Sequence, residues 1–152
     1  MVEIKVTFGQ DAFEHGQFVY VWFDGNLSPF YVGETGKSPI DRAGLHIRDS
    51  SRSGAIVSEI IQRKNNPCQE YLVLAFPLSA DLLNGVSTEN GGASSSTSHN
   101  RARKAIERKV YDVLSEQFPE MHKARGCSWS AKSSTEFAQS VLATCRARAG
   151  AA

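Results

Sequence analysis

Residues 18–33 have the sequence FVYVWFDGNLSPFYVG, and this stretch decides the fold. Its two apolar runs, 18–23 and 30–33, are rich in the aromatic and β-branched residues that favour buried strands. The cluster from Asp24 to Pro29 that separates them contains Gly, Asn, Ser and Pro, which are typical of turns. Two strands joined by a short polar turn predict a β-hairpin.

Strand-like and helix-like patterns surround this hairpin. In chain order we expect a strand over 2–8, helices over 38–48 and 54–64, a strand over 70–76, a helical turn at 80–83, and helices over 101–118 and 134–147. This order predicts a small α/β sandwich, that is, an α+β fold in which helices flank a mixed or antiparallel sheet of three to four strands.

The length and composition bound the organisation of the chain. Its 152 residues, 41% of them hydrophobic, can bury one core, so we expect a single domain over residues 1–152. Residues 84–100 are rich in Gly, Ser, Asn and Thr, which predicts a flexible loop. Because the sequence has no apolar run of about 18 residues and no signal peptide, we expect a cytoplasmic protein with no membrane partner.

The charged residues are balanced overall but unevenly distributed. The formal net charge of +1 excludes a strongly basic, histone-like protein, whereas residues 101–132 hold 8 basic and 4 acidic side chains. A basic patch of this kind suits a polyanion such as nucleic acid. An ordinary solvated helix face would have the same composition.

Strand 18–23 alternates its side chains between two faces. Alternation places Tyr20 and Trp22 on one face, and it places the other three side chains, Val19, Val21 and Phe23, on the opposite face. A tyrosine on such a strand can present its hydroxyl at the edge of the sheet while its ring stays packed. It can equally be an ordinary core residue.

Arg42 and His46 are four residues apart on the first expected helix, so their side chains point the same way. A guanidinium offers paired donors and a permanent charge that match a phosphate group. The alternative is an exposed pair bonded to Asp41 or Asp49, and on spacing alone this alternative is favoured.

Glu107 lies at the border of the apolar stripe of helix 101–118. Arg103 and Lys104 precede it by four and three residues, and we expect them to keep its carboxylate ionised. An ionised carboxylate can bind Mg²⁺, which takes few protein ligands. The alternative is an intrahelical ion pair with Arg103.

Several of these residues follow one another in the order of a known family signature. They are the tripeptides Phe18-Val19-Tyr20 and Tyr31-Val32-Gly33, the pair Arg42 and His46 on a helix, and Glu107 on a later helix that Pro119 closes. This order resembles the GIY-YIG nuclease superfamily, closely over residues 17–48 and loosely over 101–119.

The resemblance implies a GIY-YIG-like fold and a metal-dependent endonuclease that hydrolyses phosphodiester bonds in DNA by a one-metal mechanism, with RNA not excluded. Glu107 would hold Mg²⁺ or Mn²⁺. Tyr20 would act as general base, with His46 assisting, and Arg42 would clamp the phosphate. Tyr31 would orient the substrate or the attacking water.

A second set of residues is expected to contact the nucleic acid, and it consists of Gly33, Lys37, Arg101, Arg103, Lys104, Arg108 and Lys109. Gly33 would let the backbone approach closely, and the basic residues would follow the phosphates without reading the sequence. Two other interpretations stay open. Phe18 stands where the family has a glycine, and residues 119–129 lack the family's asparagine, which fits a nucleic-acid-binding module with a decayed catalytic site. A protein-interaction domain is the third possibility.

Overall fold

The computed structural model describes residues 3–48, 57, 68–86, 95–122 and 134–150. The elements in chain order are β1 (Glu3–Phe8), the 3-10 helix η1 (Gln10–Phe13), β2 (Phe18–Phe23), β3 (Pro29–Thr35), α1 (Pro39–Arg48), β4 (Cys68–Pro77), α3 (Ala80–Gly85), α4 (Ser95–Ser115) and α5 (Thr135–Ala149). The predicted α+β sandwich is confirmed, because these helices flank one four-stranded mixed sheet.

The strand order in the sheet is β1-β4-β2-β3. β2 is antiparallel to both β3 and β4, whereas β1 is parallel to β4. The predicted hairpin is therefore confirmed, and its register places Tyr20 opposite Gly33 and Trp22 opposite Tyr31. β3 lies at one edge of this sheet.

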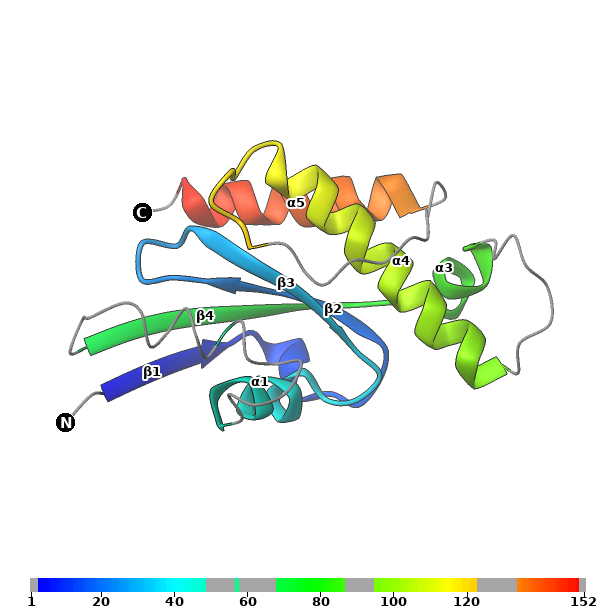
Figure 1. The fold of residues 1–152 in the computed structure, drawn as a ribbon, viewed down its shortest axis with the longest axis horizontal. Coiled ribbons are helices and arrows are strands. Elements are labelled where there is room, and N and C mark those ends of the chain that lie inside the picture. The colour runs from blue at the N-terminus through cyan, green and yellow to red at the C-terminus, as the bar shows by residue number, and fades with distance from the viewer. Residues whose placement is uncertain (1–2, 49–56, 58–67, 87–94, 123–133, 151–152) are drawn as a thin grey trace.

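The two faces of the sheet carry separate clusters of buried side chains. Val19, Val21 and Phe23 of β2 pack into the larger cluster with α4 and α5, which cover one face (Figure 1). Tyr20 and Trp22 belong to the other cluster, which includes residues of α1 on the opposite side of the sheet. The alternation predicted for residues 18–23 is thus confirmed.

Helix α4 carries the predicted apolar stripe, since Ala102, Ile106 and Val110 are all buried. It begins at Ser95, and α3 extends to Gly85, so the expectation of a loop over 84–100 is wrong for its first two and its last six residues. Starting a helix is costly, whereas extending it adds one backbone hydrogen bond for each residue that becomes fixed. The polar residues at the start of α4 can therefore extend the helix that the apolar stripe stabilises. Residues 87–94, like most of the helix expected over 54–64, lie outside the described residues.

Among the described helices, none is long and apolar enough to cross a membrane. The remaining helices follow the expected boundaries closely. α3 begins after Ser79, whose side-chain oxygen accepts a hydrogen bond from the backbone N–H of Leu82 at 3.1 Å. α5 buries Val141 and Leu142 against α4, as its apolar spacing predicts.

Candidate active site

The candidate site lies beside the edge strand β3, between α1 on one face of the sheet and α4 on the other. Tyr20 comes from β2, Tyr31 from β3, Arg42 and His46 from α1, and Glu107 from α4. The rings of Tyr20 and Tyr31 are 6.4 Å apart between centroids, and those of Tyr31 and His46 are 5.4 Å apart. The charges of Arg42 and Glu107 act on both phenols. The fold therefore brings together the five residues that the sequence had singled out.

Tyr20 and His46 form the centre of this group. The Tyr20 hydroxyl and His46 Nε2 are 2.6 Å apart, and both side chains are almost completely buried. His46 is therefore buried, and the alternative of an exposed histidine is wrong. Tyr20 lies on the α1 face of β2, and His46 lies on the side of α1 that packs onto that face.

Gly33 makes room for this arrangement. A Cβ atom at position 33 would come within 2.4 Å of the Tyr20 ring and of its hydroxyl oxygen. The space that the absent side chain leaves is occupied by Tyr20, its partner across the hairpin. The structure thus accounts for this glycine without a ligand, although we had expected it to admit the substrate backbone.

Both tyrosines are protonated at neutral pH. Burial raises the pKa of Tyr20 well above its usual value, and the neighbouring Tyr31 and Glu107 raise it further. Burial and the charge of Glu107 raise the pKa of Tyr31 in the same way. The guanidinium of Arg42 opposes both shifts, because a cation favours the phenolate. Each phenol therefore enters the site as a hydrogen-bond donor.

Glu107 is not held ionised as we had expected. Burial and the nearby carboxylate of Glu34 raise its pKa to about 8, and Lys104 and Arg42 offset only part of this shift. Arg103 does not neutralise it, because its guanidinium is directed at Glu34 instead. Desolvation of a carboxylate favours the protonated form, and an exposed lysine cannot compensate for it.

The Arg103 guanidinium joins α4 to the strands. Its Nε donates to Oε2 of Glu34 at 2.6 Å, its Nη1 donates to Oε1 of Gln17, and its Nη2 reaches Oδ1 of Asn100 at 3.4 Å. The Arg103 and Glu34 side chains are only 13% and 17% exposed. Arg103 thus anchors the helix, whereas the sequence suggested a surface contact to nucleic acid.

Glu34 is the site residue that the sequence analysis missed. It follows Gly33 on β3, so alternation directs its side chain to the α4 face and away from Tyr20. A charged residue within a strand that is otherwise almost entirely buried was the signal available. Its partner could not be identified, because Arg103 lies 69 positions further along the chain.

The other predicted nucleic-acid contacts are scattered. Lys37 is exposed and lies near Arg42 at the start of α1. Arg108 bonds within its own helix, with 2.8 Å between its Nε and Oδ1 of Asp112, and its guanidinium stacks over Tyr111. Lys104 is exposed on α4, and its positive charge lowers the pKa of Glu107. Only Lys37 and Arg103 in this set line the cavity next to the site.

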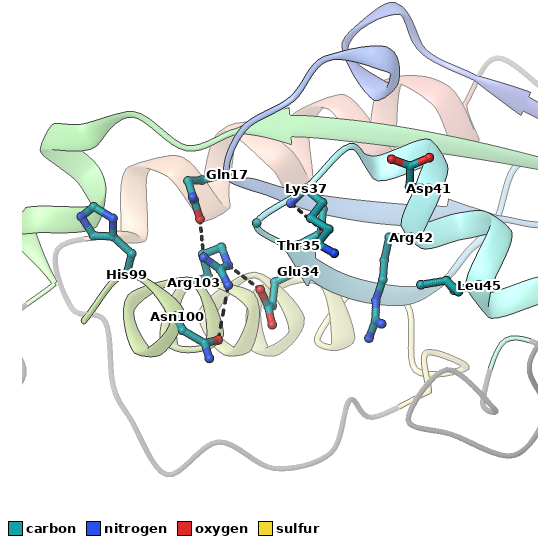
Figure 2. A pocket seen from close by; sticks show the side chains of 11 residues that line it. Gln17, Glu34, Thr35, Lys37, Asp41, Arg42, Leu45, His99, Asn100 and Arg103 are labelled. Carbon is teal, nitrogen blue, oxygen red and sulfur yellow. Dashed lines mark hydrogen bonds and ion pairs between the residues drawn. The ribbon is translucent and has the colours of Figure 1, made fainter. Parts of the chain in front are cut away.

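A cavity of about 730 Å³ adjoins the site and shares Arg42 and Glu34 with it. Its walls come from four places, namely Gln17 just before β2, the end of β3 with the following turn, helix α1, and the start of α4. Figure 2 shows Lys37 and Arg42 on the α1 side and Gln17, His99 and Asn100 on the other side of the Arg103–Glu34 pair. The site is therefore accessible beside Arg42.

The carboxylates of the site would suit a metal ion that prefers oxygen ligands. Within the described residues, no group of three or more His, Cys, Asp and Glu side chains could hold a metal ion, which is what zinc would need. Mg²⁺ and Mn²⁺ prefer oxygen ligands, and Mg²⁺ commonly binds through one or two carboxylates and keeps several waters. The half-buried carboxylate of Glu107, with Glu34 nearby, fits that requirement. A divalent cation there would also offset the repulsion between these carboxylates.

Comparisons of the chain with known protein families, with curated proteins and with solved structures found no match. They neither support nor oppose the GIY-YIG resemblance. The interpretation of the site therefore depends on its own residues and their geometry.

Proposed function

We propose that this protein is a metal-dependent endonuclease that hydrolyses phosphodiester bonds in nucleic acid, as the GIY-YIG resemblance implies. The observation that supports the proposal is the meeting of two tyrosines, a histidine, an arginine and a carboxylate beside β3. Phosphodiester hydrolysis needs a cation for the phosphate, a route for the proton of the attacking water, and stabilisation of the leaving oxygen.

Arg42 binds the scissile phosphate in this proposal. Its guanidinium is partly buried and lies at the junction of the site and the cavity, where a phosphate can reach it. Paired N–H donors match two phosphate oxygens, and the charge stays in place at any physiological pH. Partial burial strengthens this interaction as negative charge builds up in the transition state.

Tyr20 and His46 move the proton together. A buried phenol with a raised pKa is a poor base on its own, so the phenolate is not the resting form. As the Tyr20 oxygen accepts a proton from the attacking water, the phenol proton passes along the 2.6 Å bond to Nε2 of His46. The imidazole then carries the positive charge, and no free phenolate has to form. Tyr31, which is also protonated, would orient water or phosphate through its hydroxyl.

Glu107 would hold Mg²⁺ or Mn²⁺, with waters completing the coordination. When bound, such an ion neutralises charge on the phosphate and on the leaving oxygen. Glu107 must lose its proton to serve as a ligand, and its pKa of about 8 makes this loss sensitive to pH.

A plasmid-nicking assay tests the proposal. We expect wild-type protein to nick supercoiled DNA with Mg²⁺ or Mn²⁺ and not with EDTA. Arg42→Ala and Glu107→Gln should each lower the rate about a hundredfold or more, because each removes charge stabilisation. Arg146→Ala, at the exposed end of α5, is the matched control and should cut normally.

Wild-type rates for the Arg42→Ala or Glu107→Gln variant would refute the assigned roles. DNA binding without any nicking under either metal would instead identify a binding module with a decayed site. Absence of both nicking and salt-dependent binding would favour a protein-interaction domain.

A further inference from the structure

Apart from Arg42 and Glu34, the residues that line the cavity beside the site have no role in the proposed chemistry. It extends from Arg42 toward the first turns of α4 (Figure 2), and neither Tyr20 nor Tyr31 lines it. A phosphate held by Arg42 would therefore have its neighbouring nucleotide at the mouth of this cavity. The chemistry of the walls indicates what part of a nucleic acid could enter.

One wall suits an anion. Lys37 and Arg42 lie on the α1 side, and Asp41 is the acidic residue on the same side. Glu34, the other acidic group of the lining, is already paired with Arg103. Two cations against one unpaired acid leave this wall positive, which favours a phosphate.

The opposite wall suits a nucleobase. Gln17, His99 and Asn100 are uncharged or weakly basic groups that can form hydrogen bonds. Because Arg103 takes the side-chain oxygens of Gln17 and Asn100, their amide nitrogens are the donors left for a ligand. Such donors match the carbonyl and ring-nitrogen acceptors of a base, and an imidazole can stack on its face.

The size of the cavity suits a single unpaired base. A volume of about 730 Å³ is within the range of about 300–1,000 Å³ in which proteins enclose small organic ligands. A base pair inside a continuous duplex exposes only its edges in the grooves and cannot enter such a cavity. A base that is already single-stranded enters without the cost of unstacking and unpairing.

We propose that the cavity binds one unpaired nucleotide, with its phosphate toward Lys37 and Arg42 and its base toward His99 and Asn100. The assignment rests on the proposed function for the position of the scissile bond. It predicts a preference for nucleic acid with a single-stranded segment at the cleavage point.

Binding without metal tests the cavity independently of cleavage. We would measure fluorescence anisotropy of the full chain in EDTA with a labelled 12-nucleotide single strand and a blunt hairpin of matching sequence, each as DNA and as RNA. The two strands of the hairpin are joined by a non-nucleotide linker, so that it contains no unpaired base. We expect the single strand to bind at least about tenfold more tightly than the hairpin. The DNA and RNA forms identify which sugar the cavity accepts.

Variants then locate the binding. His99→Ala and Asn100→Ala should each weaken single-strand binding about tenfold and leave hairpin binding unchanged, since each removes a contact to a base. Arg146→Ala is again the control, and thermal melting checks that each variant folds. The assignment would be overturned if the single strand and the hairpin bound equally well. It would also be overturned if the His99 and Asn100 variants kept their full affinity for the single strand.

A cleavage assay separates this proposal from the proposed function. With Mg²⁺, a duplex that contains a single-stranded gap should be cut faster than a continuous duplex. Equal cutting of both overturns the cavity assignment and leaves hydrolysis standing. Selective single-strand binding with no cutting of any substrate supports the cavity and overturns hydrolysis.

Discussion

The two faces of strand β2 bury their side chains in different ways. On the α4 and α5 side, Val19, Val21 and Phe23 join a cluster dominated by aliphatic residues. On the α1 side, Tyr20 and Trp22 pack among aromatic rings, and the Tyr20 hydroxyl is bonded to His46. Apolar burial is non-directional and tolerates small shifts, whereas a buried polar pair depends on position. One strand thus has a face of apolar packing and a face that holds a buried polar pair.

This difference predicts that changes on the two faces separate stability from activity. Substitutions in the α4 and α5 core should lower the free energy of unfolding and leave the site chemistry nearly intact. Substitutions around Tyr20 should cost less stability and most of the activity. Three variants test the comparison, in decreasing order of the loss of stability that we expect from each.

Ile106→Ala has the largest expected effect. Ile106 is completely buried on α4, and loss of such a side chain costs about 2–5 kcal/mol through lost burial and the cavity left behind. Urea unfolding measures the change, and cleavage below the melting temperature should stay near wild type. Leu45→Ala, at a half-exposed position on α1, is the control and should cost less than about 1 kcal/mol. A strong loss of cleavage by folded Ile106→Ala protein would show that the two faces are not separable.

Gly33→Ala should have a moderate effect on stability and a large one on activity. The added Cβ would lie 2.4 Å from the Tyr20 ring, so the ring must move and its bond to His46 must change. Overpacking of this kind costs about 1–3 kcal/mol. Cleavage should fall at least about a hundredfold, because the proton route through Tyr20 is displaced.

Gly85→Ala is the matched control for that substitution, since a Cβ at Gly85 would meet nothing within 4 Å. It should melt and cleave like wild type. If Gly33→Ala also cleaves at the wild-type rate, Tyr20 does not carry the proton.

Glu107→Gln should cost the least stability of the three, and its effect should depend on pH. The carboxyl has a pKa of about 8 in the folded protein and a value near 4.5 when unfolded, so between these values the folded state binds the extra proton. The free energy of unfolding of the wild type therefore falls as pH rises from about 4.5 to about 8. The glutamine variant does not titrate, so it shows no such fall. In EDTA, the variant should melt about a few degrees higher than wild type at pH 8.5, with little difference at pH 4.5. A melting difference that does not change with pH would contradict the buried carboxyl.

Local patterns predicted most of the framework. The hairpin, the alternation of β2 and the apolar stripe of α4 depend on residues that are close in sequence, and each is confirmed. The start of α4 was missed, because its polar first turns resemble a loop in composition. The gathering of the site residues was predicted from the order of Tyr20, Arg42 and Glu107, which resembles the GIY-YIG signature. No single spacing would have justified that prediction.

By itself, the sequence determined which residues share a strand face or a helix face, because those relations repeat every two or about 3.6 residues along the chain. Tertiary structure alone decided the raised pKa of Glu107, the pairing of Arg103 with Glu34 and the space that Gly33 gives to Tyr20. Each of these depends on burial and on neighbours from distant parts of the chain. Electrostatic energy and steric contact are set by distances in space, and no local pattern contains them.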